Sequence, residues 1–146
     1  MKATTLYQPY ATAIMLGYKK IETRSWLTHY RGRIAIHSAA RIPPWVREFI
    51  EKERMQGRCL QELPLGAIVG FVTLTDVRMT EEVADEISDL EKRYGDYTTG
   101  RWAWMLSDIT PLKRSIPTKG ARMIWEWAGV EPCSICGDTV GVCECI

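Results

Sequence analysis

The sequence has no long apolar run, and this absence bears on where the protein is expected to act. No stretch approaches the roughly 20 apolar residues that a membrane-spanning helix requires. The opening residues, MKATTLYQPY, also lack the apolar core of about 7 to 15 residues that marks a secretion signal. We therefore expect a soluble, cytoplasmic protein that does not bind membranes.

The sequence also lacks a surplus of charge of either sign. Nineteen Lys and Arg residues are balanced by 18 Asp and Glu residues, which gives a formal net charge of +1. A protein this close to neutral has no uniformly basic surface of the kind that holds duplex nucleic acid without sequence preference. Any contact with nucleic acid must therefore be local.

Internal repeats and low-complexity linkers are missing as well. A chain of 146 residues, 46% of them hydrophobic, fits one compact domain that needs no disulfide to be stable. The sequence predicts this domain over residues 1–129 and a short cysteine-rich tail over residues 130–146.

Short strands alternate with helices along the domain. Strands are predicted over 3–7, 21–26, 33–38, 67–77, 101–106 and 123–127, with a hairpin-like region over 109–112. Residues 33–38 and 101–106 alternate with period two, whereas 67–77 is a dense apolar run typical of a buried strand. Apolar residues at helical spacing predict helices over 10–17 and from Pro44 to about Gly57. A third helix, solvated on the surface, is expected over 80–93. These elements predict an α+β domain built around a small β-barrel with flanking helices.

The most informative segment carries the pattern GxKxxExR, from Gly17 to Arg24. Alternation along a strand places Glu22 and Arg24 on one face, and Lys20 joins them if the strand begins that early. Lys19 lies at the preceding turn, from which it can reach the same groove. A carboxylate held among cations orients their donors toward a phosphate or an acyl oxygen. On the pattern alone, an exposed ladder of ion pairs is the alternative.

The neighbouring motifs make this pattern more specific. It lies between QPYA and YRGRIAIHSA, and it is followed by the strand AIVGFVTLTDV and by PTKG ahead of Ile124 and Trp125. Over Lys2 to Gly129 the chain resembles the ASCH family. The resemblance implies a PUA-like β-barrel with helices beside a groove, a fold associated with RNA binding. We therefore expect RNA or a modified nucleoside as the ligand.

The resemblance also bears on catalysis, because family members differ in activity. Some small members look like amidohydrolases that deacetylate N4-acetylcytidine, one is linked to ribonuclease action, and others look like coactivator or RNA-binding modules. In a hydrolase, Lys19 and Glu22 would be the catalytic acid–base pair. The amidohydrolase members carry a threonine at the position of Glu22, however, and a carboxylate cannot replace a hydroxyl nucleophile without a change of mechanism. Thr23 is expected on the opposite face of the strand.

Residues near the motif complete the expected ligand site. The ligand-binding candidates are Gln8, Tyr10, Lys20, Arg24, Trp26, Tyr30, Arg31, His37 and Lys119. Trp26 and Tyr30 are the best candidates for stacking on a base, with core packing as the alternative for each. His37 is expected on a strand that neighbours the GxKxxExR strand, on the side away from the core.

Four cysteines in the tail have the spacing of a metal site. Cys133 and Cys136 form CxxCG, and Cys143 and Cys145 form CxC. Four thiolates complete a tetrahedral structural zinc site with no position open for substrate. Two disulfides, a redox pair or free thiols are the alternatives, and disulfides are disfavoured in the cytosol. Such a tail could also dock a protein partner, which makes an adaptor role a further alternative for the whole chain.

Overall fold

A computed structural model describes residues 1–133 of the chain. Its centre is one six-stranded sheet with the strand order β2-β5-β4-β3-β1-β6. The strands are β1 Lys2–Leu6, β2 Ile21–Arg24, β3 Gly32–Ser38, β4 Ala67–Met79, β5 Trp102–Pro117 and β6 Ile124–Glu126. The helices are α1 Tyr10–Met15, α2 Arg47–Met55, α3 Thr80–Val83 and α4 Asp89–Arg93, and a 3-10 turn over Pro44–Val46 leads into α2. No helix within residues 1–133 is long and apolar enough to cross a membrane.

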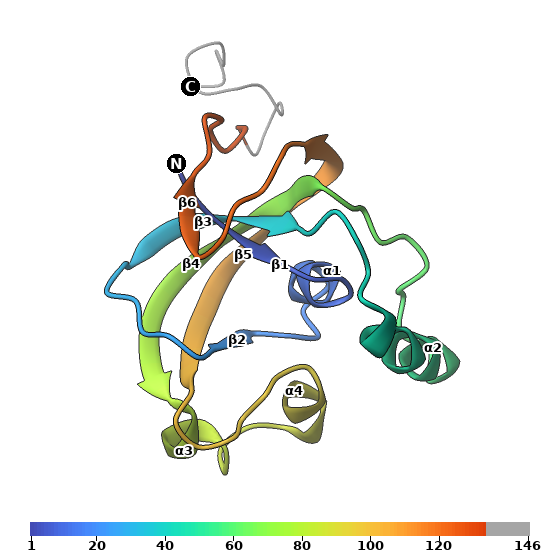
Figure 1. The fold of residues 1–146 in the computed structure, drawn as a ribbon, viewed down its shortest axis with the longest axis vertical. Coiled ribbons are helices and arrows are strands. Elements are labelled where there is room, and N and C mark those ends of the chain that lie inside the picture. Colours follow the sequence, from blue (N-terminus) through green and yellow to red (C-terminus); the bar gives the residue numbers. More distant parts are fainter. Residues whose placement is uncertain (134–146) are drawn as a thin grey trace.

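The sheet curls into a half-barrel, as Figure 1 shows. The longest strands, β4 and β5, run antiparallel, and their register shifts between Ile68 and Gly70, between Phe71 and Thr73, and again just after Leu74. Each shift places one or more extra residues in one strand, which bends the pair and strengthens its twist. An α+β half-barrel is consistent with the predicted PUA-like fold, in the form of an open, curled sheet.

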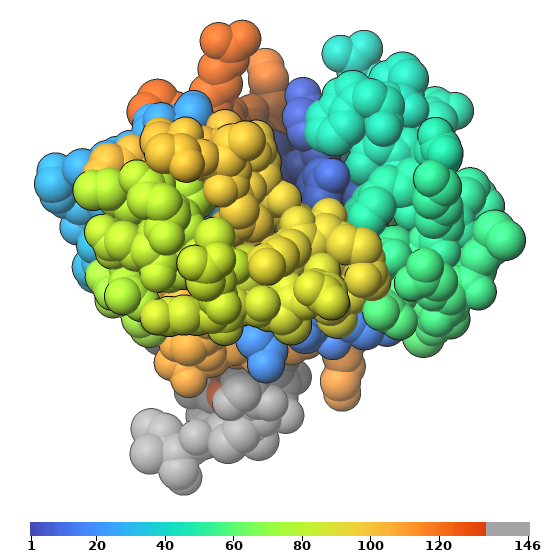
Figure 2. All heavy atoms as spheres, turned by 90° about the horizontal axis from the view of Figure 1, so that it is seen from below, coloured from blue at the N-terminus to red at the C-terminus, as the bar shows by residue number. Residues whose placement is uncertain are grey.

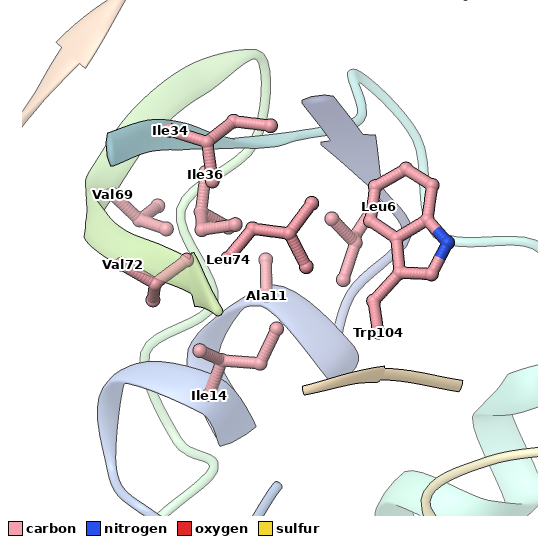
Figure 3. Close-up of a cluster of buried hydrophobic side chains, with 9 residues drawn as sticks. All are labelled: Leu6, Ala11, Ile14, Ile34, Ile36, Val69, Val72, Leu74 and Trp104. Carbon is pink, nitrogen blue, oxygen red and sulfur yellow. The ribbon is translucent and has the colours of Figure 1, made fainter. Parts of the chain in front are cut away.

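The main core lies where α1 packs against the concave face of the sheet. Side chains from α1 and four strands meet there (Figure 3), and the cluster consists of Leu6, Ala11, Ile14, Ile34, Ile36, Val69, Val72, Leu74 and Trp104. The intervening Ala35 points into a second cluster with Phe71 and Trp127. Strand β3 is therefore covered on both faces, and its alternation separates two buried layers.

Four expectations from the sequence need correction. The strand over 101–106 and the hairpin-like region over 109–112 are one continuous strand, β5. Residues 80–93 form two short helices, α3 and α4, because the chain turns out of helix over 84–88. The second of these is not a solvated surface helix, since Glu91 is buried and accepts hydrogen bonds from the backbone N–H groups of Lys20 and Ile21. Strand β3 does not neighbour β2: β3 lies between β4 and β1, and β2 pairs with β5.

Candidate functional site

The charged residues of GxKxxExR form a row of three side chains. Gly17 ends α1 with a φ of 81°, a backbone angle that glycine adopts without strain, and the chain then turns into β2. Lys19 Nζ lies 3.6 Å from Glu22 Oε1, and the other carboxylate oxygen lies 3.7 Å from Arg24 Nη2. Glu22 therefore stands between two cations.

The two cations of this row are fixed in different ways. Lys19 is 1% exposed and donates from Nζ to the Tyr94 carbonyl oxygen at 2.5 Å. Arg24 donates from Nη2 to the Thr5 carbonyl oxygen at 2.9 Å, which ties β2 to β1 across the open side of the half-barrel. The Arg24 guanidinium also lies over the Trp104 ring, 5.5 Å from its centroid. These contacts preorganise the row before any ligand binds.

Burial shifts the protonation equilibria around this row. Burial lowers the pKa of Lys19, and the carboxylates of Glu22 and Glu91 oppose that shift. Burial also raises the pKa of the Tyr10 hydroxyl, and the Glu22 charge raises it further. Tyr10 therefore stays a neutral hydrogen-bond donor at physiological pH. Lys19 Nζ lies over its ring, 5.7 Å from the ring centroid.

A cavity of about 470 Å³ opens beside Glu22 and Arg24. It is lined by Thr5, Leu6, Tyr7, Tyr10, Glu22, Thr23, Arg24, Trp45, Arg93, Tyr94, Gly95, Asp96 and Arg101. Figure 2 shows the hollow between the yellow segment that follows α4 and the teal segment that leads to α2, with the blue N-terminal segment at its floor. Three arginines and two carboxylates line this central cavity. Lys19 is not among its lining residues and supports Glu22 from the protein interior.

Several residues expected to bind ligand lie elsewhere. Gln8 is fully buried, where its amide donates to the Pro64 carbonyl oxygen and accepts from Thr12 N–H. The Lys20 side chain is exposed and does not line the central cavity, because β2 begins only at Ile21. Tyr10, by contrast, lines the cavity together with Glu22 and Arg24.

Trp26, Tyr30 and Arg31 occupy three different environments. Trp26 packs edge-to-face on Trp104 at 4.9 Å between ring centroids and lines an adjoining cavity of about 370 Å³ that also contains Arg24. Tyr30 donates its hydroxyl to the Arg33 carbonyl oxygen at 2.5 Å, and Arg31 Nη2 lies 3.8 Å from Asp76 Oδ1. Neither Tyr30 nor Arg31 lines the central cavity.

His37 and Lys119 line a separate cavity of about 330 Å³. His37 Nε2 donates to the Thr118 carbonyl oxygen at 2.8 Å, so the ring accepts at Nδ1 from the Thr5 hydroxyl at 3.1 Å. The Thr5 hydroxyl in turn accepts from Trp125 Nε1. This chain of hydrogen bonds gives His37 a structural role between β1, β3 and the segment before β6.

The structure adds cavity residues that the sequence reasoning missed, among them two arginines and two exposed aromatic residues. Arg93 and Arg101 belong to the segment around α4 and the start of β5, and Tyr7 and Trp45 contribute aromatic walls. The sequence carried no signal that separates Trp45 from Val46, its buried neighbour in the same 3-10 turn. Trp45 is 68% exposed.

The geometry agrees with the comparison to known families. Residues 5–113 match the model of the ASCH domain. The chain belongs to the ASCH domain family. The expected family is thus confirmed over most of the half-barrel, from the end of β1 to residue 113 within β5.

Relatives of this ASCH domain include much longer proteins. Human Activating signal cointegrator 1 is 25% identical over 128 residues, and the mouse protein is 24% identical over the same length. The match covers 84% of this chain but only 21% of each cointegrator.

Among solved structures, the ASCH protein from Zymomonas mobilis is 19% identical with a TM-score of 0.50, and the match covers 80% of this chain and 72% of that one. A tyrosine-to-phenylalanine variant of the same protein is 20% identical, also with a TM-score of 0.50, and covers 80% and 74%. At this level of identity the likeness shows a shared fold.

The zinc site stays a prediction. Cys136, Cys143 and Cys145 lie outside the described residues, and Cys133 is the last residue within them. Within residues 1–133 no group of three or more His, Cys, Asp or Glu side chains could hold a metal ion.

Proposed function

We propose that this ASCH domain binds RNA in the central cavity, with one nucleotide beside Glu22 and Arg24. The observation that carries the proposal is the cavity lining: arginine donors and aromatic rings surround a volume of about 470 Å³, which suits a small ligand. Arginine forks match phosphate geometry, and aromatic rings stack on bases. The PUA-like half-barrel, a fold associated with RNA binding, supports the same proposal.

The residues of the cavity divide this task between them. Arg93 and Arg101 line the cavity, each within ion-pair distance of a carboxylate: Arg93 Nη2 lies 3.6 Å from Glu53 Oε2, and Arg101 Nε lies 3.5 Å from Asp96 Oδ2. The remaining donors of these guanidinium groups are proposed to bind an incoming phosphate. Glu22, 13% exposed and held by Lys19 and Arg24, accepts hydrogen bonds from a base amino group or a ribose hydroxyl. An acceptor that is already oriented loses little entropy when it binds.

Titration of a fluorescently labelled pentacytidylate tests this proposal. A variant with Arg93→Gln and Arg101→Gln is expected to bind about tenfold more weakly, because two phosphate partners are lost. The slope of log affinity against log salt concentration should become less steep by about 1.4, since each phosphate contact to a single strand contributes about 0.7 to that slope.

A matched control removes the same charge elsewhere. Lys113 and Arg114 are exposed on β5 and do not line the central cavity, so Lys113→Gln with Arg114→Gln should change affinity less than about twofold. Wild-type protein that shows no salt-sensitive binding, or an equal loss in both double variants, would contradict the proposal.

A second candidate function is hydrolysis of an acylated nucleoside such as N4-acetylcytidine. The observation that favours it is the position of Glu22 on the cavity wall, where its carboxylate could take a proton from an attacking water. In this reaction water adds to the acetyl carbon, the amide C–N bond breaks, and acetate and cytidine leave. Chromatography of N4-acetylcytidine incubated with wild-type protein and with Glu22→Gln tests it. Equal product from both proteins would reject hydrolysis.

A further inference from the structure

Two further cavities share lining residues with the central one. A cavity of about 390 Å³, lined by Tyr7, Arg41, Ile42, Pro43, Pro44 and Arg47, meets the central cavity at Tyr7. The 370 Å³ cavity with Trp26 meets the central cavity at Thr5, Leu6, Tyr7 and Arg24 and also contains Arg122. The three hollows therefore border one another at Tyr7, and we call them together the extended groove.

The first flank of the extended groove combines exposed aromatic rings with unpaired cations. Tyr7 is 50% exposed and Trp45 is 68% exposed, although large aromatic side chains are usually buried. Their rings meet edge-to-face, with centroids 6.1 Å apart and an angle of 88°, so one ring does not cover the face of the other. Arg41 and Arg47 are exposed and form no ion pair within the part of the chain that the structure describes.

The second flank repeats this combination. Trp26 contributes a half-buried ring, and Arg122 is an exposed cation without an ion pair among residues 1–133. Arg122 also lines the cavity of Lys119, so positive charge continues beyond this flank. A groove that tracks a single-stranded nucleic acid needs this repetition of cation and aromatic ring at successive nucleotides.

We infer that the ligand is an internal segment of single-stranded RNA, at least three nucleotides long, that passes through the extended groove. One base lies in the central cavity, a neighbouring base stacks on Trp45 and Tyr7 with its phosphate near Arg41 and Arg47, and the strand leaves past Arg122. The inference rests on the proposed function and deepens it, because a free nucleoside would use the central cavity alone. A protein segment with acidic and aromatic residues is the competing occupant. The combination of cations and an aromatic ring in each of the two adjoining cavities favours the nucleic acid.

Length dependence of binding separates these possibilities. We expect wild-type protein to bind pentacytidylate at least about tenfold more tightly than cytidine monophosphate, because each flank adds stacking and phosphate contacts. Arg41→Gln with Arg47→Gln should weaken pentacytidylate about fivefold or more while cytidine monophosphate binds as before, since neither arginine lines the central cavity. Trp45→Phe should retain most of the pentacytidylate affinity, whereas Trp45→Leu should lose about tenfold.

The controls make failure of this inference distinct from failure of the proposed function. If cytidine monophosphate binds and pentacytidylate binds no better, the extended groove is overturned and the central site stands. If neither ligand binds, the proposed function itself fails. A pentaglutamate peptide that competes with pentacytidylate at equal concentration would also overturn the inference. Lys113→Gln with Arg114→Gln, away from the three hollows, should leave both affinities unchanged.

Discussion

At the scale of single residues, the buried Lys19 beside Glu22 makes the stability of the fold depend on pH. Its pKa is lowered from the ordinary value of 10.5 because it is buried. Between that lowered pKa and 10.5, the unfolded chain binds a proton that the folded chain does not, so the free energy of unfolding should rise with pH across this window. Lys19→Met should flatten the rise, which urea titrations at about pH 8, 9 and 9.5 would measure.

The upper end of that pH window is set by tyrosines. Burial raises the pKa of Tyr10, Tyr94 and Tyr97, so above about pH 10 the unfolded chain loses those protons first and stability falls again. Lys20→Met is the matched control, because that neighbouring lysine is exposed. A slope equally flattened in Lys19→Met and Lys20→Met would refute the role given to Lys19.

Glu91 is a second residue whose role depends on burial. One of its carboxylate oxygens accepts from Lys20 N–H at 3.0 Å and from Ile21 N–H at 2.9 Å, so α4 holds the first residues of β2 in place. Glu91→Ala would leave both donors unsatisfied, and we expect a loss of about 2 to 4 kcal/mol in urea denaturation. Lys92→Ala, an exposed neighbour on α4, should cost less than about 0.5 kcal/mol. Equal losses in the two variants would contradict this anchoring role.

The site shows how far single residues can be predicted. Lys19, Glu22 and Arg24 lie within one short segment, so strand alternation was enough to place the last two together. Arg93 and Arg101 reach the cavity from a segment about 70 residues later in the chain, and only the pairing of β2 with β5 brings them there. Glu91 was assigned to a solvated face for the same reason, because its partners are distant in sequence.

At the scale of elements, the curvature of the β4–β5 pair depends on Gly70. A Cβ atom there would overlap Met15 Sδ and lie 2.6 Å from the Thr110 carbonyl oxygen. Because the second contact is with backbone, Gly70→Ala must displace β5 or α1, and we expect a loss of about 1 to 3 kcal/mol. Thr75→Ala, exposed on the same strand, should cost less than about 1 kcal/mol in the same urea titration. An unchanged stability in Gly70→Ala would show that this close packing does not shape the sheet.

The elements themselves were largely predictable, and the exceptions have a physical cause. The apolar run of β4 and the alternation of β3 identified both strands, because each places side chains in buried layers. The stretch 80–93 had a single helical pattern of charge, yet the chain breaks it at Ser88, whose hydroxyl accepts from Glu91 N–H and starts α4 anew. A local hydrogen bond thus outweighed helical propensity, and it turns Glu91 toward β2.

At the scale of the whole molecule, the positive charge is concentrated along one groove while the net charge stays near neutral. A net charge of +1 limits attraction to duplex nucleic acid in general, while Arg41, Arg47 and Arg122 concentrate positive charge along the extended groove. The proposed RNA binding therefore predicts selectivity for single strands, since a base inside a duplex cannot offer its face to the exposed Trp45 ring.

The last prediction concerns the tail, where the cysteine spacing favours one structural zinc ion. Purified protein should contain about one zinc per chain by elemental analysis, because four thiolates fill the tetrahedral coordination of a single ion. Cys133→Ser with Cys136→Ser should lose that zinc, since two remaining thiolates bind it far more weakly. Cys59→Ser is the matched control, because Cys59 is an exposed thiol on the segment after α2 and should leave the zinc content unchanged. If pentacytidylate binding survives removal of the zinc, RNA recognition belongs to the half-barrel alone, and the tail is left for a partner protein. Wild-type protein purified without zinc would remove the metal site.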